Sequence, residues 1–122
     1  TPEQELVEAH SFLAIVENKE IPSLKSLKVS EESYILGLLD CIGELKRFVL
    51  DNIRNNQLKN ADRIFNVMEN LYQTLYPFAM YDKIVKETRR KLDVNRLLVE
   101  ETRAVITEEI RRNHFVKALT KK

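Results

Sequence analysis

The sequence predicts an all-α protein, an antiparallel helical bundle that ends in one long helix. Two glycines and three prolines in 122 residues leave little material for turns. No segment shows the alternation of β-branched and polar residues that a strand requires, whereas apolar residues recur at helical spacing along most of the chain. The length suffices for one buried core, so residues 1–122 are expected to form a single helical domain.

Composition excludes several classes of protein. The chain is 43% hydrophobic and 32% charged, as globular proteins are, and no apolar run approaches the ~18 residues that a membrane span needs. We therefore expect no membrane partner. Cys41 is the single cysteine, which excludes an internal disulfide and a cysteine-based zinc cluster, and no signal-peptide pattern is present. A cytoplasmic location is expected. The net charge of +1 is too small to argue for nucleic-acid binding from charge alone.

The first helix is predicted from Pro2 to about Asn18. Thr1 and Gln4 have the residue types and spacing of a capping box, and proline suits the first helical position. Its apolar stripe is expected to comprise Leu6, Ala9, Leu13 and Val16, widened by Val7, Phe12 and Ile15. Residues 20–30, which follow, form the one convincing loop.

Two further helices are predicted in the middle of the chain. Ser30 is expected to cap a helix that reaches about Asn55, with its apolar positions at Tyr34, Leu38, Ile42, Leu45, Val49 and Ile53. Asn60 is expected to cap the next helix, which Pro77 breaks or kinks. The apolar stripe of that helix comprises Ile64, Phe65, Val67, Met68, Leu71, Tyr72 and Leu75.

A long final helix is predicted from about Asp82, because no glycine or proline occurs after this point. Its apolar positions recur every seven residues, at Val85, Leu92, Val99 and Ile106. Thirty helical residues span ~45 Å, which is longer than a domain of this size can cover on one side. Partner helices from other subunits are therefore expected, and residues 116–122 are expected to be a frayed basic tail.

Two pairs of carboxylates have the spacing of single helix faces. Glu5 and Glu8 are three residues apart, and Asp40 and Glu44 are four apart. Drawing all four into a partly buried cleft would cost several kcal/mol unless a cation or protons neutralised them, and oxygen ligands favour magnesium, manganese or calcium. Taken alone, such pairs are more often solvated or paired with cations such as Arg47, so both interpretations stay open.

Both glycines of the chain flank one of these acids, since Gly37 and Gly43 lie three residues before and after Asp40. A glycine inside a helix costs ~1 kcal/mol relative to alanine. Something is therefore expected to approach this backbone closely. A neighbouring helix is the favoured explanation, and a nucleic-acid backbone is the alternative.

Other catalytic arrangements fail on their spacing. Neither His10 nor His114 completes the Glu-x-x-His pair of a di-iron bundle, and no glycine-rich phosphate loop is present. Cys41 lies in an apolar helix, where it is expected to be a small core residue rather than a nucleophile.

Three stretches of the chain resemble the translin and TRAX (translin-associated factor X) family. YILGLLDCIGELKR, residues 34–47, resembles the family helix Y-hydrophobic-x-G-x-x-D-x-x-G-E-L-x-R. QELVEAHSF, residues 4–12, resembles the Q-E-Y-V-E-A-x-S-F helix of the TRAX branch, and RRKLDVNR, residues 89–96, resembles the start of the last helix of archaeal members. The resemblance covers nearly all of the chain. It implies a translin-type helical domain.

The resemblance also implies a function. The family assembles into hollow octamers, and TRAX-type subunits resemble Mg²⁺-dependent endoribonucleases that act on RNA inside the shell. By this resemblance Glu5, Glu8 and Asp40 ligate Mg²⁺, or Mn²⁺ in its place, with Glu44 as a fourth acid. Metal-activated water would then cleave the RNA. Arg47 would pair with Glu44 or reach an RNA phosphate, with pairing favoured.

The expected partners are single-stranded RNA or short duplexes, and a homo-oligomer or a hetero-oligomer with other translin-family subunits. Family members have further helices, with RNA-contacting basic residues, before the first acidic motif. This chain begins almost at that motif, so it is expected to be a truncated form or a short member, corresponding to the C-terminal two-thirds of the family domain. The alternative function is a non-catalytic RNA-binding or assembly subunit of the same helical family.

Overall fold

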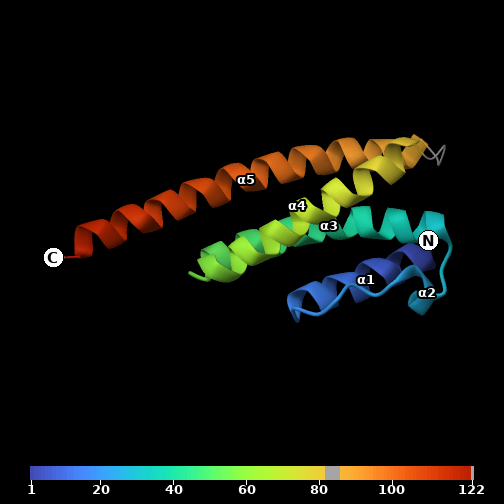
Figure 1. Ribbon diagram of the computed structural model, residues 1–122, viewed down its shortest axis with the longest axis horizontal. Helices are drawn as coiled ribbons and strands as arrows, with labels where there is room; N and C mark the ends of the chain where they lie inside the picture. Colours follow the sequence, from blue (N-terminus) through green and yellow to red (C-terminus); the bar gives the residue numbers. More distant parts are fainter. Residues whose placement is uncertain (82–85, 122) are drawn as a thin grey trace.

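The computed structural model describes residues 1–81 and 86–121, which contain five helices. These are α1 (Pro2–Val16), the short α2 (Leu24–Leu27), α3 (Glu31–Arg54), α4 (Leu58–Tyr81) and α5 (Lys86–Thr120). Figure 1 shows α3, α4 and α5 running in alternating directions, with α1 along α3 and the C-terminal part of α5 extending beyond the other helices. The prediction of an all-α bundle with a long last helix is confirmed.

Helix α1 runs parallel to α3, because the linker between them returns the chain to its starting end (Figure 1). Val7 contacts Gly37, and five residues further along α1 the ring of Phe12 meets that of Phe48 edge-on at 5.7 Å. Residue numbers thus increase together along both helices. This parallel register places the first half of α1 beside the middle of α3.

The predicted capping box at the start of α1 is confirmed. The backbone N–H of Gln4 donates to Oγ1 of Thr1 at 3.2 Å, and the Thr1 amino group donates to Oε1 of Gln4 at 3.1 Å. The helix ends at Val16 rather than at Asn18, which adopts a left-handed conformation with φ 57°.

The predicted apolar stripe of α1 is confirmed at Val7 and Ile15, which are buried, and at Phe12, which packs against the core, but it is wrong at Leu6, Ala9 and Leu13. Leu6 and Leu13 are 41% and 55% exposed, and Ala9 is exposed. The face that packs against α3 instead consists of Val7, Ser11, Ala14 and Ile15. The close approach of Val7 to Gly37 fixes the rotation of α1 about its axis, and Ser11 was missed because a buried serine leaves no apolar signal.

The linker between α1 and α3 is more ordered than the predicted loop. It contains α2, whose N-terminus is capped by the Ser23 side chain. Ser30 caps α3 as predicted, and its own N–H donates to the Glu3 carboxylate at 2.8 Å. The Tyr34 hydroxyl donates to the Pro22 carbonyl at 2.7 Å, which holds the linker against α3.

The predicted cap of α4 is wrong, and so is a break at Pro77, whereas the alternative of a kink at Pro77 stays a prediction. Asn60 does not cap this helix, which begins at Leu58, but donates through Nδ2 to Oδ1 of Asn52 on α3 at 2.9 Å. Pro77 does not end it either, since the helix continues to Tyr81. A proline inside a helix removes one backbone hydrogen bond. Burial of neighbouring side chains such as Leu75, which is 4% exposed, outweighs that loss.

The core lies between α3, α4 and α5. The predicted stripes of these helices are largely confirmed, with Leu38, Ile42, Leu45, Val49, Ile64, Met68, Leu92, Val99 and Ile106 all buried. Val85 and the predicted start at Asp82 lie outside the described residues, as does Lys122. The frayed tail was wrongly predicted for residues 116–120, which continue α5 as a helix to Thr120.

Arg63 of α4 holds the C-terminal end of α1. Its guanidinium donates to the carbonyls of Ile15 at 3.0 Å and Val16 at 3.3 Å, and its Nε donates to Oδ1 of Asn60 at 3.1 Å. The last carbonyls of a helix have no partner within the helix. Arg63 therefore donates hydrogen bonds to carbonyls at the end of α1 and connects this end to the α3–α4 corner.

Within residues 1–81 and 86–121, no helix combines the length and the apolar content needed to cross a membrane.

Candidate active site

The parallel packing of α1 on α3 brings acids of the two predicted pairs toward one another. Glu8 and Asp40 are half-buried, whereas Glu5 and Glu44 are exposed. Burial is the largest cause that raises the pKa of the Glu8 carboxyl, and the negative charges of Asp40 and Glu44 follow. Glu5 raises the same pKa least. Glu8, Asp40 and Glu44 thus form the centre of an acidic cluster with Glu5 at its edge, and we call these four residues the acid cluster.

Gly37 is the reason that α1 comes so close. A methyl group at this position would lie 2.6 Å from Cβ of Val7 and 2.8 Å from the backbone oxygen of Gln4. Carbon atoms that are not bonded to each other do not approach so closely, so glycine is required here for helix packing. The favoured explanation of close helix packing is confirmed for this glycine.

Lys91 of α5 supplies a positive charge to the acid cluster. Its ammonium forms an ion pair with the Asp40 carboxylate, and both side chains are partly buried, at 25% and 30% exposed. Lys91 also lowers the pKa of Glu8, against the combined effect of burial and the acids. A cation of the protein itself therefore compensates part of the charge that the sequence analysis assigned to a metal.

Neighbouring residues of α5 fix this arrangement. Asn95, one turn after Lys91, is buried and donates through Nδ2 to the backbone oxygen of Leu39 at 2.9 Å. It belongs to a series of buried polar residues at seven-residue spacing, Thr88, Asn95 and Thr102, which alternate with the predicted apolar series. This spacing was the signal that could have located Asn95. Nothing in the sequence distinguishes Lys91 from the preceding arginines, and it was missed.

The arrangement differs from the expected metal site. Across the part of the chain that the structure describes, no three His, Cys, Asp or Glu side chains form a group that could hold a metal ion. The donors of the acid cluster are nevertheless all oxygen, and burial, followed by repulsion from Asp40 and Glu44, raises the pKa of Glu8. Ligation by Glu5, Glu8, Asp40 and Glu44 stays a prediction.

Arg47 lies on the surface of α3, one turn beyond Glu44. The favoured expectation was an ion pair between these two residues. Among the ion pairs of the described residues none involves Arg47, so this expectation is wrong for the arrangement seen. Its contact with RNA stays a prediction.

Beside the acid cluster lies a cleft between α3 and α5 with a volume of about 340 Å³. Its lining residues are Leu39, Asp40, Gly43, Glu87, Arg90, Lys91, Val94 and Asn95. A methyl group at Gly43 would meet only Cδ1 of Leu98, at 3.9 Å, which is an ordinary contact. Close helix packing therefore does not require this glycine, which lines the cleft.

Cys41 is not a nucleophile, as expected. It is fully buried, and burial together with three carboxylates of the acid cluster raises the pKa of its thiol to about 12. A neutral, buried thiol is a small core residue. Neither His10 nor His114 is among the charges that shift the pKa of Glu8, and both are exposed.

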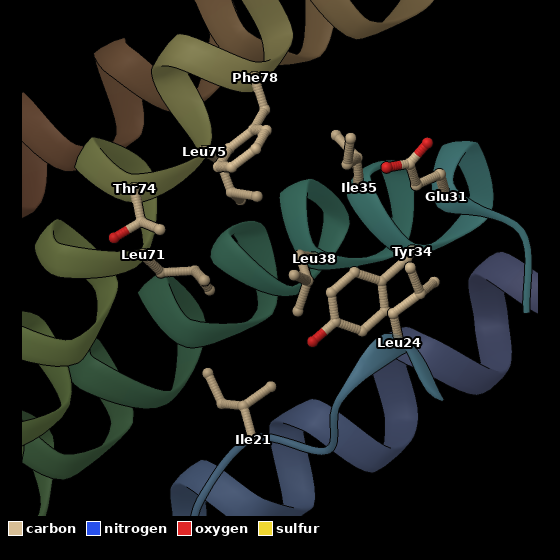
Figure 2. Close-up of a pocket in the computed structure, with 10 residues that line it drawn as sticks. All are labelled: Ile21, Leu24, Glu31, Tyr34, Ile35, Leu38, Leu71, Thr74, Leu75 and Phe78. Atoms are coloured by element: carbon tan, nitrogen blue, oxygen red, sulfur yellow. The ribbon is translucent and has the colours of Figure 1, made fainter. Parts of the chain in front are cut away.

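A second pocket, also of about 340 Å³, lies between the linker, α3 and α4 (Figure 2). Its walls are mostly apolar side chains from the linker, α3 and α4, and Glu31 is the charged residue among the ten that Figure 2 labels. Polar groups that converge on a substrate distinguish a reactive site from an apolar groove. The acid cluster and its cleft are therefore the stronger candidate.

Comparison with known proteins supports the family resemblance. The translin family matches residues 2–106. A protein of Methanocaldococcus jannaschii, described as uncharacterized, is 47% identical over 103 residues, which are 84% of this chain and 46% of the relative. The chain thus spans about half the length of this curated relative.

Two solved structures are similar in both sequence and fold. A crystal structure of AfC3PO has a TM-score of 0.80 and 33% identity, covering 92% of this chain and 60% of that one. A complex of AfC3PO with duplex RNA has a TM-score of 0.78 and 31% identity, covering 90% and 58%. Since the family match spans most of the chain and the structures agree with it, this chain belongs to the translin family.

Proposed function

We propose that this chain is an RNA-binding subunit of a translin-family assembly and that it cleaves RNA with the help of a divalent cation. The observation that carries the proposal is the acid cluster, in which burial and then the charges of Asp40 and Glu44 raise the pKa of the half-buried Glu8. Carboxylates gathered in this way bind Mg²⁺ or Mn²⁺ through oxygen. Support for RNA as the substrate comes from the similarity to AfC3PO, of which a duplex RNA complex is known.

Each member of the cluster has a role in this proposal. Glu5, Glu8 and Asp40 would hold the cation, with Glu44 as a fourth acid, and the bound cation would supply Lewis acidity toward water and the phosphodiester. Such a reaction needs no protein nucleophile, in keeping with the buried thiol of Cys41. Arg47 is exposed on the same helix as Asp40 and Glu44, so its guanidinium is accessible to an RNA phosphate.

Assembly with further subunits belongs to the same proposal. Several large apolar side chains of α1 and α5 are exposed, namely Leu6, Leu13, Val94, Leu97, Val105, Phe115, Val116 and Leu119. Those at the end of α5 lie on the part that extends beyond the other helices (Figure 1). Apolar surfaces of this kind favour association with further helices of a homo-oligomer or hetero-oligomer.

A non-catalytic RNA-binding or assembly subunit is the second candidate. The observation that favours it is the ion pair between Lys91 and Asp40, which compensates the charge of this acid without a metal. In this case the only role of the acids would be to stabilise the packing of α1, α3 and α5.

Cleavage of labelled RNA tests the proposal. Short single-stranded and duplex RNAs are incubated with protein whose mass has been measured by light scattering, in Mg²⁺, in Mn²⁺ and in EDTA. We expect an oligomer that cleaves RNA only with a divalent cation. Asp40→Asn is expected to lower the rate by about 100-fold or more, because it removes a charged oxygen ligand.

Asp51→Asn is the matched control, because Asp51 is an exposed acid of the same helix and its substitution removes the same charge. Its rate should equal that of the wild type. Cleavage that persists in EDTA, or that falls equally in both variants, would refute the metal-dependent reaction. RNA binding without any cleavage would establish the second candidate instead.

A further inference from the structure

The apolar pocket of Figure 2 and the end of α5 lie at opposite ends of the molecule. The pocket lies where α3 begins and α4 ends, and Figure 1 shows α5 extending past the other helices in the opposite direction. Helix α5 runs parallel to α3, since Lys91 pairs with Asp40 and, further along both helices, Glu101 pairs with Lys46. At 1.5 Å per residue, Phe115 lies ~36 Å farther along α5 than Lys91. The end of α5 therefore cannot reach the pocket of its own chain.

The pocket is apolar and open to solvent. Phe78 of α4 lines it and is 56% exposed, and Thr74, one turn earlier, is exposed as well. Figure 2 shows the side chains of α4 and those of the linker on opposite sides of the pocket, with Leu38 and Tyr34 of α3 between them. Its volume of about 340 Å³ lies at the lower end of the range for ligand pockets, so it suits a few large side chains.

The end of α5 presents apolar side chains to solvent. Ile106, which is 3% exposed, is the last buried residue of the described part of this helix. Beyond it, Phe115, Val116 and Leu119 are 65%, 50% and 61% exposed. Phe115 and Leu119 are four residues apart and therefore lie on one helix face. Helices that bind in apolar grooves use anchor residues with this spacing.

The two surfaces carry opposite charges. Residues 110–121 contain four basic residues and no acidic residue, and Arg111 lies one turn before Phe115 on the same helix face. Glu31 is the charged residue that lines the pocket. Among the ion pairs that the described part of the chain forms, none involves Glu31 or Arg111. The end of α5 is thus complementary to the pocket in both charge and apolar character.

We propose that the end of α5 binds in the apolar pocket of a second copy of this chain, with Phe115 and Leu119 as the anchors and the basic residues of the helix facing Glu31. This contact is heterologous, because it joins two different surfaces of the same protein. Each added copy brings another pocket and another helix end, so copies add until a ring closes. The inference rests on the assembly part of the proposed function and identifies the surfaces that meet.

Light scattering of two variants tests the contact. Phe115→Asp places a charge on the anchor, and Thr74→Lys places a long, positively charged side chain in the pocket. Both residues are exposed, so each variant should keep the helical content of the wild type in circular dichroism. The wild type is expected to be larger than the monomer of 14.4 kDa, and each variant alone is expected to be a monomer.

An equimolar mixture of the two variants is expected to form a dimer and nothing larger. Phe115→Asp keeps an intact pocket and Thr74→Lys keeps an intact helix end, so one pairing remains and it cannot propagate. Leu119→Asp, on the same face as Phe115, should pair with Thr74→Lys in the same way. His114→Asp is the matched control, because it adds the same charge at a neighbouring exposed position on a different helix face, and it should keep the mass of the wild type.

The outcomes separate this inference from the proposed function. If the wild type is an oligomer but either Phe115→Asp or Thr74→Lys keeps its mass, or if their mixture is no heavier than the variants alone, the contact is refuted and the assembly part of the proposed function stands. Loss of association in Phe115→Asp only would mean that the end of α5 packs on another surface. A wild type that is monomeric over the whole concentration range would refute both. Cleavage of RNA is measured separately, since neither Phe115 nor Thr74 belongs to the acid cluster.

Discussion

The two glycines of α3 lie less than two turns apart but have different structural roles. At Gly37, α1 approaches so closely that a methyl group would lie 2.6 Å from Cβ of Val7. At Gly43 the nearest neighbour of such a methyl group would be 3.9 Å away, and the residue lines a cleft. The comparison shows that close packing requires glycine at one level of the helix but not at the next. Asp40 lies between these two levels.

The largest effect is expected for Gly37→Ala. Alanine gains ~1 kcal/mol of helix propensity, but its methyl group would force α1 away from α3, and overpacking of this kind costs about 1–3 kcal/mol or more. We expect a net loss of stability, measured as a lower midpoint of urea unfolding. A midpoint equal to or above that of the wild type would show that α1 can shift without cost.

A smaller effect of opposite sign is expected for Gly43→Ala. The added methyl group makes one ordinary contact, with Leu98, so the gain in helix propensity should remain. The variant should be more stable by up to about 1 kcal/mol in the same urea experiment. A loss of stability similar to that of Gly37→Ala would mean that the two levels of α3 do not differ as the structure indicates.

The smallest effect concerns the pH dependence of stability. Because the pKa of Glu8 is raised above 4.5 in the folded chain, the folded state binds more protons than the unfolded state just above pH 4.5. Stability therefore falls as pH rises through that window, and Glu8→Gln should remove this contribution. We expect the variant to be slightly more stable at neutral pH, by less than about 1 kcal/mol because solvent screens the charge.

Thermal unfolding of both proteins between neutral pH and pH 4.5, without divalent cations, measures this difference. The difference in stability between Glu8→Gln and the wild type should decrease as the pH falls. Glu20→Gln, an exposed linker residue, is the control and should show no such trend. A stability difference that increases toward pH 4.5 would contradict the raised pKa of Glu8.

Most of the fold was predictable, because three long helices carry regular apolar spacing and Ser30 and Thr1 have clear capping chemistry. The errors have specific causes. Leu6, Ala9 and Leu13 of α1 were wrongly placed in the core because the approach of Val7 to Gly37 on another helix turns them outward. Asn60 has the residue type of a cap, but its side-chain amide instead donates a hydrogen bond to Asn52 across the corner between α3 and α4.

The candidate site was predictable only in part. The spacing of Glu5, Glu8, Asp40 and Glu44 indicated two acidic faces, and the family resemblance indicated that they belong together. Lys91 could not be found in this way, since its pairing with Asp40 depends on how α5 lies against α3, 51 residues away in the sequence. Local spacing contains no information about such a contact.

The hydrogen bonds from Arg63 to the last carbonyls of α1 affect how mutational surveys of the acid cluster should be interpreted. Glu5 and Glu8 lie in the first half of α1, and Arg63 secures that helix from its far end, ~12 Å from Glu8 along the axis. Loss of these hydrogen bonds would allow Glu5 and Glu8 to move relative to Asp40. A screen that records only lost cleavage would then rank Arg63 with the reacting groups, although it touches none of them.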